Sequence, residues 1–323
     1  MYLKNFFKVF PLLFSGFLIV GLSFNVFAKQ QEDSKVVFEK ILQKGIVEKE
    51  TLKAFDGIKK IYGENNHTLW NNRAAADFIK WLPKISEDGL NPHFYHLEKM
   101  KDFAKKGNED ATKIKLDILL TDAALTLASN LAFGINITDE QKYNWYKKEQ
   151  MASLLPAVLK AIENKTAPQY LESLTPKDPR YVNLAKALQK YKKMAHKEDW
   201  VIITKGPKME EGVEDIRVRS LRKRLIAEGY LENKEVKNPG LFDGKLKEAL
   251  MAFQQEHSLE PDGLAGALTV EALNVTLNQR IKQICVSLDR LREILPQLPG
   301  HYLLVDIPAF RLWVYEKNND VLT

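Results

Sequence analysis

The spacing of apolar residues predicts a chain built mainly of helices. Between residues 36 and 170, apolar side chains recur every three or four positions, and few stretches alternate as strands do. Residues 114–128 are apolar on nearly all sides, which predicts a long helix buried in a core. Asp178 and Pro179 mark another helix start, because Asp caps a first turn and Pro fits within it. These patterns predict a helical first domain.

The pattern changes after Lys197. Residues 201–207, VIITKGP, are short and strand-like, and we place a domain boundary near Lys208. Amphipathic spacing then predicts three shorter helices, within residues 215–231, 242–259 and 266–274. Pro261-Asp262-Gly263 forms a tight turn before the third of these. A further helix begins at Thr276, which pairs with Gln279 in a capping box.

The last residues have strand character. Residues 302–305 and 312–315 are apolar runs, separated by a break at Pro308 and followed by a turn at Asn318-Asn319. Two strands leave unpaired edges and an uncovered apolar face, so we expect residues 302–323 to be disordered or to lie against another surface. The predicted fold class is mainly α, with a helical scaffold domain, a three-helix module and an incomplete β segment.

The amino terminus has the pattern of a secretory signal peptide. Lys4 and Lys8 precede an apolar core at residues 9–24, and small residues at Val26 and Ala28 predict cleavage after Ala28. An uncleaved amino-terminal anchor is the alternative, and the apolar core is short for a membrane span. In either case the pattern predicts export, with membrane contact only through the signal segment if it is uncleaved.

The net charge narrows the class of partner. The chain carries +6 at a pI of about 9.0, and removing Lys4 and Lys8 leaves +4, that is 6 minus 2. This balance suits an anionic partner such as a membrane surface, nucleic acid or the acidic stem peptides of a bacterial wall. Without a glycine-rich phosphate loop or a basic surface interleaved with aromatics, no nucleic acid is expected. The cationic run 217–224 is interpreted as a solvated helix side, with contact to wall carboxylates as the alternative.

Neither the cysteine nor the histidines indicate a reactive centre. A single Cys forms no internal disulfide, and Cys285 lies on the apolar stripe of the helix from Thr276, which indicates a small buried hydrophobe rather than a nucleophile. His93 and His96 could share a helix face, but no third ligand lies at suitable spacing. We therefore expect no metal site and no cofactor.

Residues 215–274 resemble a common bacterial peptidoglycan-binding module of three helices. The matching positions are Leu221, Leu225, Gly229-Tyr230-Leu231, Phe242-Asp243-Gly244, Ala249, Phe253-Gln254, Leu259, Asp262-Gly263, Gly266, Thr269 and Leu273-Asn274. Ala267 stands where the module usually has proline, and the loop before Phe242 is longer than usual. The resemblance implies peptidoglycan as the partner, with Tyr230, Gln254, Asp262 and Thr269 as candidate binding residues, although Asp262 and Thr269 also fit as turn and cap residues.

The wider arrangement resembles the scaffold-bearing L,D-transpeptidases of the Gram-negative periplasm. The stretch LLTDAALTLASNLAFGIN at residues 119–136, the DGLNP loop and LTPKDPRY at residues 174–181 resemble its scaffold. Residues 287–316 resemble the lead-in to its catalytic domain. The implied division is a signal peptide at 1–28, a scaffold domain at 36–207, a peptidoglycan-binding domain at 208–275, a connecting helix at 276–300 and first catalytic strands at 301–323. The implied location is the periplasm.

The family's reaction is acyl transfer by a Cys thiolate, which an upstream His activates and backbone N–H groups assist. Its His…Ser-x-Gly-Cys motif is not found in these residues, and Cys285 precedes the catalytic strands, so no catalytic residue is assigned. Two hypotheses remain. The chain is a periplasmic peptidoglycan-binding scaffold protein of wall biogenesis without its own catalysis, or it is a fragment of an active L,D-transpeptidase whose catalytic part is encoded downstream.

Overall fold

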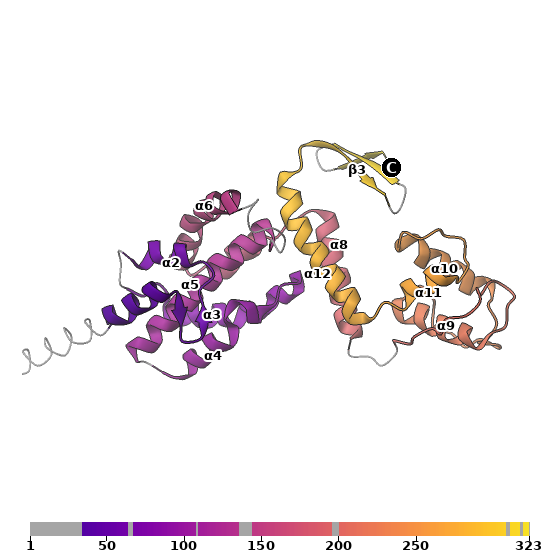
Figure 1. Cartoon of the computed structure of the whole chain (residues 1–323), viewed down its shortest axis with the longest axis horizontal. Helices are drawn as coiled ribbons and strands as arrows, with labels where there is room; N and C mark the ends of the chain where they lie inside the picture. The colour runs from indigo at the N-terminus through magenta and orange to yellow at the C-terminus, as the bar shows by residue number, and fades with distance from the viewer. Residues whose placement is uncertain are drawn as a thin grey trace, which may run out of the picture. The chain divides into compact units, whose positions relative to one another are not determined.

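The computed structural model describes residues 34–63, 67–107, 109–135, 144–195, 200–307, 311–316 and 319–322. Within these residues the fold is mainly α, as predicted, and it contains two small antiparallel sheets (Figure 1). The chain forms two compact units. Unit 1 comprises Met1–Ser86, Asn91–Ala132 and Asn136–Thr175, and unit 2 comprises Glu87–Leu90, Phe133–Ile135 and Pro176–Thr323. The predicted signal peptide lies outside the described residues.

Unit 1 is a helical domain with one short hairpin. Its elements are a helix at 34–44, β1 (Ile46–Val47), β2 (Glu50–Thr51), α2 (Phe55–Tyr62), α3 (Asn72–Trp81), the 3₁₀ helices η1 (Leu82–Asp88) and η2 (Pro92–Tyr95), α4 (Leu97–Lys105), α5 (Asp110–Phe133), α6 (Asn144–Glu163) and α7 (Ala167–Ser173). The last residues of η1 and α5 belong to unit 2.

Helix α5 forms the core of unit 1, which confirms the predicted buried helix. It is long and apolar enough to cross a membrane, but most of its side chains are buried by the protein, as in the core helix of a folded domain. Its buried Asp117 is stabilised by hydrogen bonds, because it accepts the hydroxyl of Tyr62 at 2.5 Å and the N–H of Trp70 at 2.7 Å. Through these hydrogen bonds, the Asp117 side chain of α5 holds neighbouring segments of unit 1 against the helix.

Unit 2 contains a pair of helices, a group of three helices and a sheet. Its elements are α8 (Pro179–Met194), α9 (Ile216–Glu228), α10 (Gly244–Glu256), α11 (Ala267–Leu273), α12 (Leu277–Ile294), the 3₁₀ helix η3 (Leu295–Gln297), β3 (His301–Asp306), β4 (Arg311–Glu316) and β5 (Asn319–Leu322). Helices α8 and α12 pack together through Tyr181, Leu188, Ile284 and Leu288. The last division between the compact units falls after Thr175. The predicted domain boundary at 207/208 lies within unit 2 and stays a prediction.

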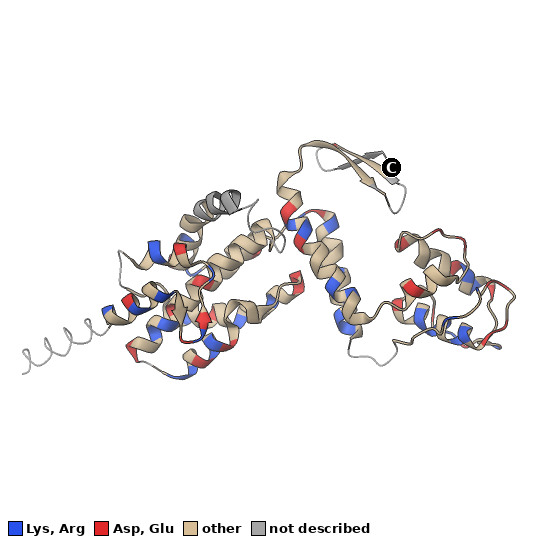
Figure 2. Ribbon diagram, viewed as in Figure 1, with Lys and Arg blue, Asp and Glu red and all other residues tan. Residues whose placement is uncertain are grey.

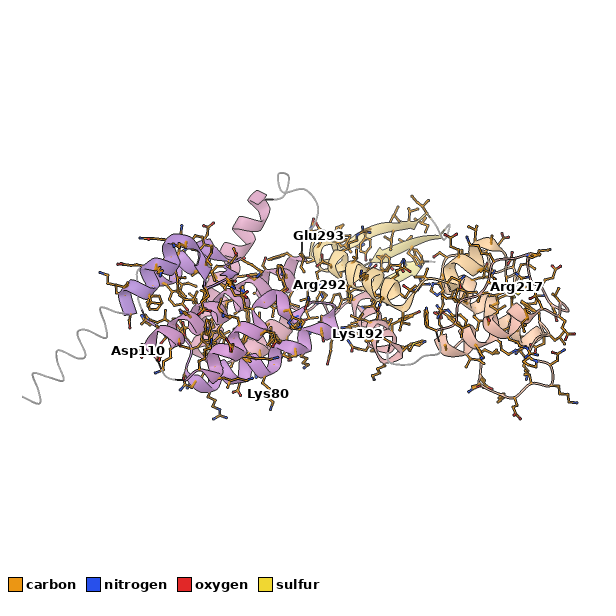
Figure 3. All side chains as sticks on the ribbon, turned by 60° about the horizontal axis from the view of Figure 1, so that its bottom comes forward. Lys80, Asp110, Lys192, Arg217, Arg292 and Glu293 are labelled. Carbon is orange, nitrogen blue, oxygen red and sulfur yellow. The ribbon has the colours of Figure 1, made fainter. Side chains whose placement is uncertain are left out.

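A buried arginine fixes the α8–α12 pair. Arg292, labelled on α12 in Figure 3, donates to the hydroxyl of Tyr181 at 2.7 Å and to the carbonyl of Asp88. Next to this contact, Gly89 has a φ of +77° and lies so close to α12 that a Cβ there would be 3.2 Å from the Sγ of Cys285. Cys285 is half-buried in the same apolar cluster, and burial raises the pKa of its thiol. This position agrees with the interpretation of Cys285 as a small buried hydrophobe rather than a nucleophile.

Helices α9, α10 and α11 form the predicted three-helix module. Their shared core is completely buried at Leu221, Leu225, Phe242, Leu250 and Phe253, among others. The predicted caps are present: Asp243 accepts from the N–H of Leu246, and Gly229 ends α9 with a φ of +87°, the left-handed conformation that favours glycine. The capping box of Thr276 and Gln279 also forms.

The carboxyl-terminal segment forms an antiparallel sheet of three strands in the order β3-β4-β5, one strand more than predicted. The described residues of this segment thus form strands rather than the expected disordered tail, while Leu303, Val305 and Leu312 stay exposed, so the alternative of a segment lying against another surface applies only near Tyr315. Tyr302 pairs with Tyr315 across the strands, and their rings stack 4.6 Å apart. The guanidinium of Arg180 at the start of α8 lies 4.9 Å from the Tyr315 ring, so a cation–π contact links sheet and helix.

We expect Gly134→Ala to destabilise unit 2 more than Gly212→Ala does. Both glycines have positive φ, +73° and +88°, so either alanine costs about 1 kcal/mol of folding free energy. Only at Gly134 would the new Cβ also lie 2.8 Å from a backbone atom, the carbonyl oxygen of Asp289, whereas nothing lies within 4 Å at Gly212. Thermal unfolding followed by circular dichroism measures both, and equal shifts would contradict this packing.

Candidate functional site

The structure places Gln254 at the centre of the module's turn. Its side chain is 1% exposed, and its Nε2 donates to Asp262 Oδ1 at 2.8 Å, to the carbonyl of Leu264 at 3.1 Å and to Thr269 Oγ1 at 3.2 Å. Its Oε1 accepts the N–H of Gly263 at 2.9 Å. All polar atoms of the Gln254 amide therefore form hydrogen bonds within the protein, as expected of a residue that stabilises the turn between α10 and α11.

Three of the four predicted binding residues therefore come together, through Gln254. Asp262 is exposed, and its Oδ1 also accepts the N–H of Leu264 at 2.8 Å, which makes it a turn residue with a carboxylate edge toward solvent. Thr269 is 6% exposed and is the third residue of α11, whose cap is Gly266, so it does not act as the cap. This cluster holds the turn in place.

Tyr230 lies apart from that cluster, directly after the Gly229 cap. Its half-buried ring contacts Phe253 edge-on at 5.5 Å between centroids, and its hydroxyl donates to the exposed carboxylate of Glu256 at 2.6 Å. Burial, and then the Glu256 carboxylate, raise the pKa of the Tyr230 hydroxyl. A phenol ring beside a solvent-facing carboxylate offers both an apolar face and a hydrogen-bond acceptor to a ligand.

The cationic run 217–224 is not the solvated helix side that the sequence suggests. Arg222 and Arg224 are buried, and only Arg219 and Lys223 of the run are exposed. Arg222 pairs with Asp243 at 2.9 Å, while Arg217, labelled in Figure 3, is bound to Asp215 at 2.6 Å. Most of these cations therefore serve the module's own fold.

Arg224 joins the module to the segments that flank it. Its Nε donates to the carbonyl of Leu273 at 2.7 Å, and its guanidinium stacks on the ring of Trp200. Its Nη2 lies 2.9 Å from Glu228 Oε1 as an ion pair, although the two groups lack hydrogen-bond alignment. The other carboxylate oxygen of Glu228 accepts the hydroxyl of Tyr191 on α8 at 3.0 Å, so the charge cluster spans module and helix pair.

The end of α11 gathers donors from several elements. The carbonyls of its last turn carry the negative end of the helix dipole, which favours cations there. Arg280 of α12 donates to the carbonyl of Ala272 at 3.0 Å, and Trp200 donates to the carbonyl of Val275 at 3.1 Å. Asn274 bonds both the N–H and the carbonyl of Ile203, each at 2.8 Å. These hydrogen bonds attach the end of the module to α12, which follows it, and to residues 200–203, which precede it.

His257 lies beside this cluster with its Nε2 buried and without a hydrogen-bond partner. Its ring packs against Phe253 at 4.2 Å between centroids. Burial, together with the positive charges of Arg280 and Arg224, lowers the pKa of His257 from 6.5 to about 4. The side chain is therefore neutral near pH 7 and would become a third cation in the cluster on acidification.

Sequence reasoning missed a second polar network, which lies in unit 1. The buried ring of His96 has its Nδ1 2.6 Å from Glu50 Oε2 and its Nε2 2.9 Å from Asp122 Oδ2. His93 is exposed and lies 3.9 Å from Glu98, so the two histidines do not share partners. In the described part of the chain, no group of three or more His, Cys, Asp or Glu side chains is arranged to hold a metal. The feature of the sequence that points to this network is Asp122, a carboxylate in an otherwise apolar stretch.

Comparison with known families gives two matches. Residues 56–188 match the family described as Scaffold domain, and residues 214–273 match the family described as Putative peptidoglycan binding domain. No curated protein matches the chain. The second match spans α9, α10 and α11, and the matched range includes all four predicted binding residues. The chain therefore combines a scaffold domain with a peptidoglycan-binding domain.

We expect Gln254→Ala to lower the free energy of unfolding by about 2 kcal/mol or more, because it leaves the buried N–H of Gly263 without its acceptor. Urea unfolding followed by circular dichroism measures this change. Gln255→Ala, at the exposed neighbouring position of the same helix, is the matched control and should change little. Equal stability of the two variants would show that the Gln254 amide does not hold the turn.

His257 should make the stability of unit 2 depend on pH between 6.5 and 4. Because its pKa is lower in the folded state than in the unfolded state, the unfolded state binds more protons in that interval. Its contribution is complete above pH 6.5 and is lost as the pH falls toward 4. His257→Phe keeps a ring without a titrating group, so the difference in melting temperature between variant and wild type should grow in the variant's favour on acidification. A constant difference would contradict this assignment.

Proposed function

We propose that the chain is a periplasmic peptidoglycan-binding scaffold protein of the L,D-transpeptidase type, acting in cell-wall biogenesis. The proposal rests on the three-helix module, which has a completely buried core and matches a peptidoglycan-binding family. The same chain contains a matched scaffold domain. The export pattern of the amino terminus and the basic charge of +6 support a target that is extracytoplasmic and anionic.

Within the module, we assign the direct contact to Tyr230 and Glu256. The Tyr230 ring is partly exposed and is nearly perpendicular to the ring of Phe253, and we assign its exposed part to the apolar face of a sugar ring. The Glu256 carboxylate beside it accepts hydrogen bonds from sugar hydroxyls. Asp262 and Thr269 remain candidate contacts at the neighbouring turn, with Gln254 holding that turn in shape.

The apolar face of the carboxyl-terminal sheet favours the second candidate function, a fragment of an active L,D-transpeptidase. Leu303, Val305 and Leu312 lie on one face of the sheet and are 65%, 61% and 48% exposed. A sheet with an apolar face is normally covered by a further layer, which suits the start of a larger β domain. The test is the nucleotide sequence beyond the Thr323 codon. A His…Ser-x-Gly-Cys motif in any frame supports this function, and its absence excludes it.

Co-sedimentation with purified sacculi tests the first function. We expect Tyr230→Ala to weaken retention roughly tenfold, equal to about 1.4 kcal/mol, because an aromatic anchor at a binding surface carries much of the affinity. Tyr170→Ala, which removes another half-buried tyrosine in α7, is the matched control and should bind as the wild type does. Absence of wild-type retention, or retention that survives deletion of residues 215–274, would contradict the proposal.

A further inference from the structure

The structure points to a second part of the wall-binding surface, outside the matched module. We propose that Lys186, Lys190 and Lys193 of α8 bind the carboxylates of peptidoglycan stem peptides, next to the Tyr230–Glu256 contact. We call these three side chains the α8 lysine stripe. This inference rests on the proposed function and deepens it, because it adds an electrostatic contact for the peptide to the sugar contact of the module.

The charge of the chain is concentrated on two helices. Helix α8 has five cations and no acidic residue, and α12 has four cations and two acidic residues, so the pair carries an excess of seven positive charges. The whole chain carries +6. In Figure 2 Lys and Arg recur along both helices, and the acidic residues of the pair lie toward the end of α12. An anionic ligand would therefore meet its strongest attraction in unit 2 at this pair.

The three lysines share one side of α8. They stand at positions i, i+4 and i+7, which lie on one stripe of an α-helix. All three are exposed, whereas Tyr181 and Leu188 on the opposite side are buried against α12. Lys192, labelled in Figure 3, stands four residues after Leu188, on the same side of α8 as that buried residue, and is less exposed. The stripe is thus a row of ammonium groups with no acidic residue on its own helix.

Contacts with the module place Lys190, the middle residue of the stripe, close to the residue that precedes Tyr230. The Nζ of Lys190 donates to the carbonyl of Glu228 at 2.6 Å and lies 3.6 Å from where a Cβ of Gly229 would stand. Gly229 directly precedes Tyr230 in the chain. The ammonium of Lys190 has three N–H groups, and one bond to Glu228 leaves others for a ligand.

The helix is held in this position by a neighbouring residue. The hydroxyl of Tyr191 donates to the Glu228 carboxylate, which is itself paired with the buried Arg224. Burial, and then the negative charge of Glu228, raise the pKa of the Tyr191 hydroxyl, so it stays protonated and keeps donating. Lys190 therefore reaches the end of α9 by a fixed contact of α8 with the module.

The ligand chemistry follows from this juxtaposition. Peptidoglycan carries carboxylates on short peptides that branch from its sugars, so a sugar at Tyr230 brings a carboxylate within reach of a neighbouring cation. Lysine binds carboxylates as a point charge on a long, flexible stem, which suits mobile peptides. The same stripe would also attract an anionic lipid surface, but its continuity with the candidate sugar contact favours the wall.

The test compares retention on sacculi of the full mature chain and of the K186Q/K190Q/K193Q variant. We expect the triple variant to bind at least tenfold more weakly at low salt and to show a smaller dependence on salt, because fewer ionic contacts remain. The matched control is K35Q/K40Q/K44Q, which removes the same charge from the exposed positions of the helix at 34–44. Circular dichroism at 25 °C confirms that both variants are folded.

A second measurement leaves the protein unchanged. Amidating the carboxylates of the sacculi should weaken wild-type binding to the level of the α8 variant and should weaken the variant little further. Wild-type retention that is equal to that of the α8 variant, or is insensitive to amidation, overturns this inference and leaves the proposed function standing. Absence of wild-type retention overturns both. Loss of binding to phosphatidylglycerol vesicles with unchanged retention on sacculi would assign the stripe to lipid and overturn the wall contact.

Discussion

The buried guanidinium of Arg224 is the constraint on which the arrangement of unit 2 depends. A charge out of water is tolerated only where ionic and hydrogen-bonding partners surround it. Here the partners come from separate parts of the chain: the carbonyl of Leu273 at the end of α11, the ring of Trp200 before the module and the carboxylate of Glu228 within α9. Burial lowers the pKa of Arg224 to about 10, and the side chain stays charged near pH 7. Glu228 compensates the charge, and the carbonyl of Leu273 and the ring of Trp200 supply the remaining contacts, so the guanidinium holds the three segments together.

This constraint extends from the fold of the module to its proposed function. Glu228 pairs with Arg224 and also accepts from Tyr191, so the helix pair α8–α12 is attached at the point where the module has its aromatic contact. A second attachment is Arg280 of α12 on the carbonyl of Ala272. A binding surface that combines Tyr230 with the α8 lysine stripe depends on both attachments. The proposed wall contact is thus a property of unit 2 as a whole rather than of the matched module alone.

Local features could be predicted from the sequence because their causes are local. The Asp178, Asp243 and Thr276 caps and the Gly229 helix end depend on backbone groups within a few residues, and all are present. The mainly α class and the buried α5 follow equally from apolar spacing. The proximity of Gln254, Asp262 and Thr269 follows from the turn between α10 and α11. The function of these residues as wall contacts stays a prediction.

Features set by distant partners could not be predicted in this way. Arg222 and Arg224 were interpreted as solvated because a charge on a helix usually is, and only the tertiary positions of Asp243, Leu273 and Trp200 make their burial possible. The same applies to His96, whose partners are 46 and 26 residues away. The third strand, β5, was missed because its four residues carry no apolar alternation long enough to recognise.

The most direct test of the account is hydrogen–deuterium exchange of the full mature chain with and without a soluble disaccharide-tetrapeptide from peptidoglycan. A composite surface predicts slower exchange in two regions together: residues 229–231 and 253–257 of the module, and residues 186–193 of α8. Slower exchange that is confined to the module, or that falls in unit 1 alone, would contradict the claim that the wall-binding surface crosses from the module onto α8.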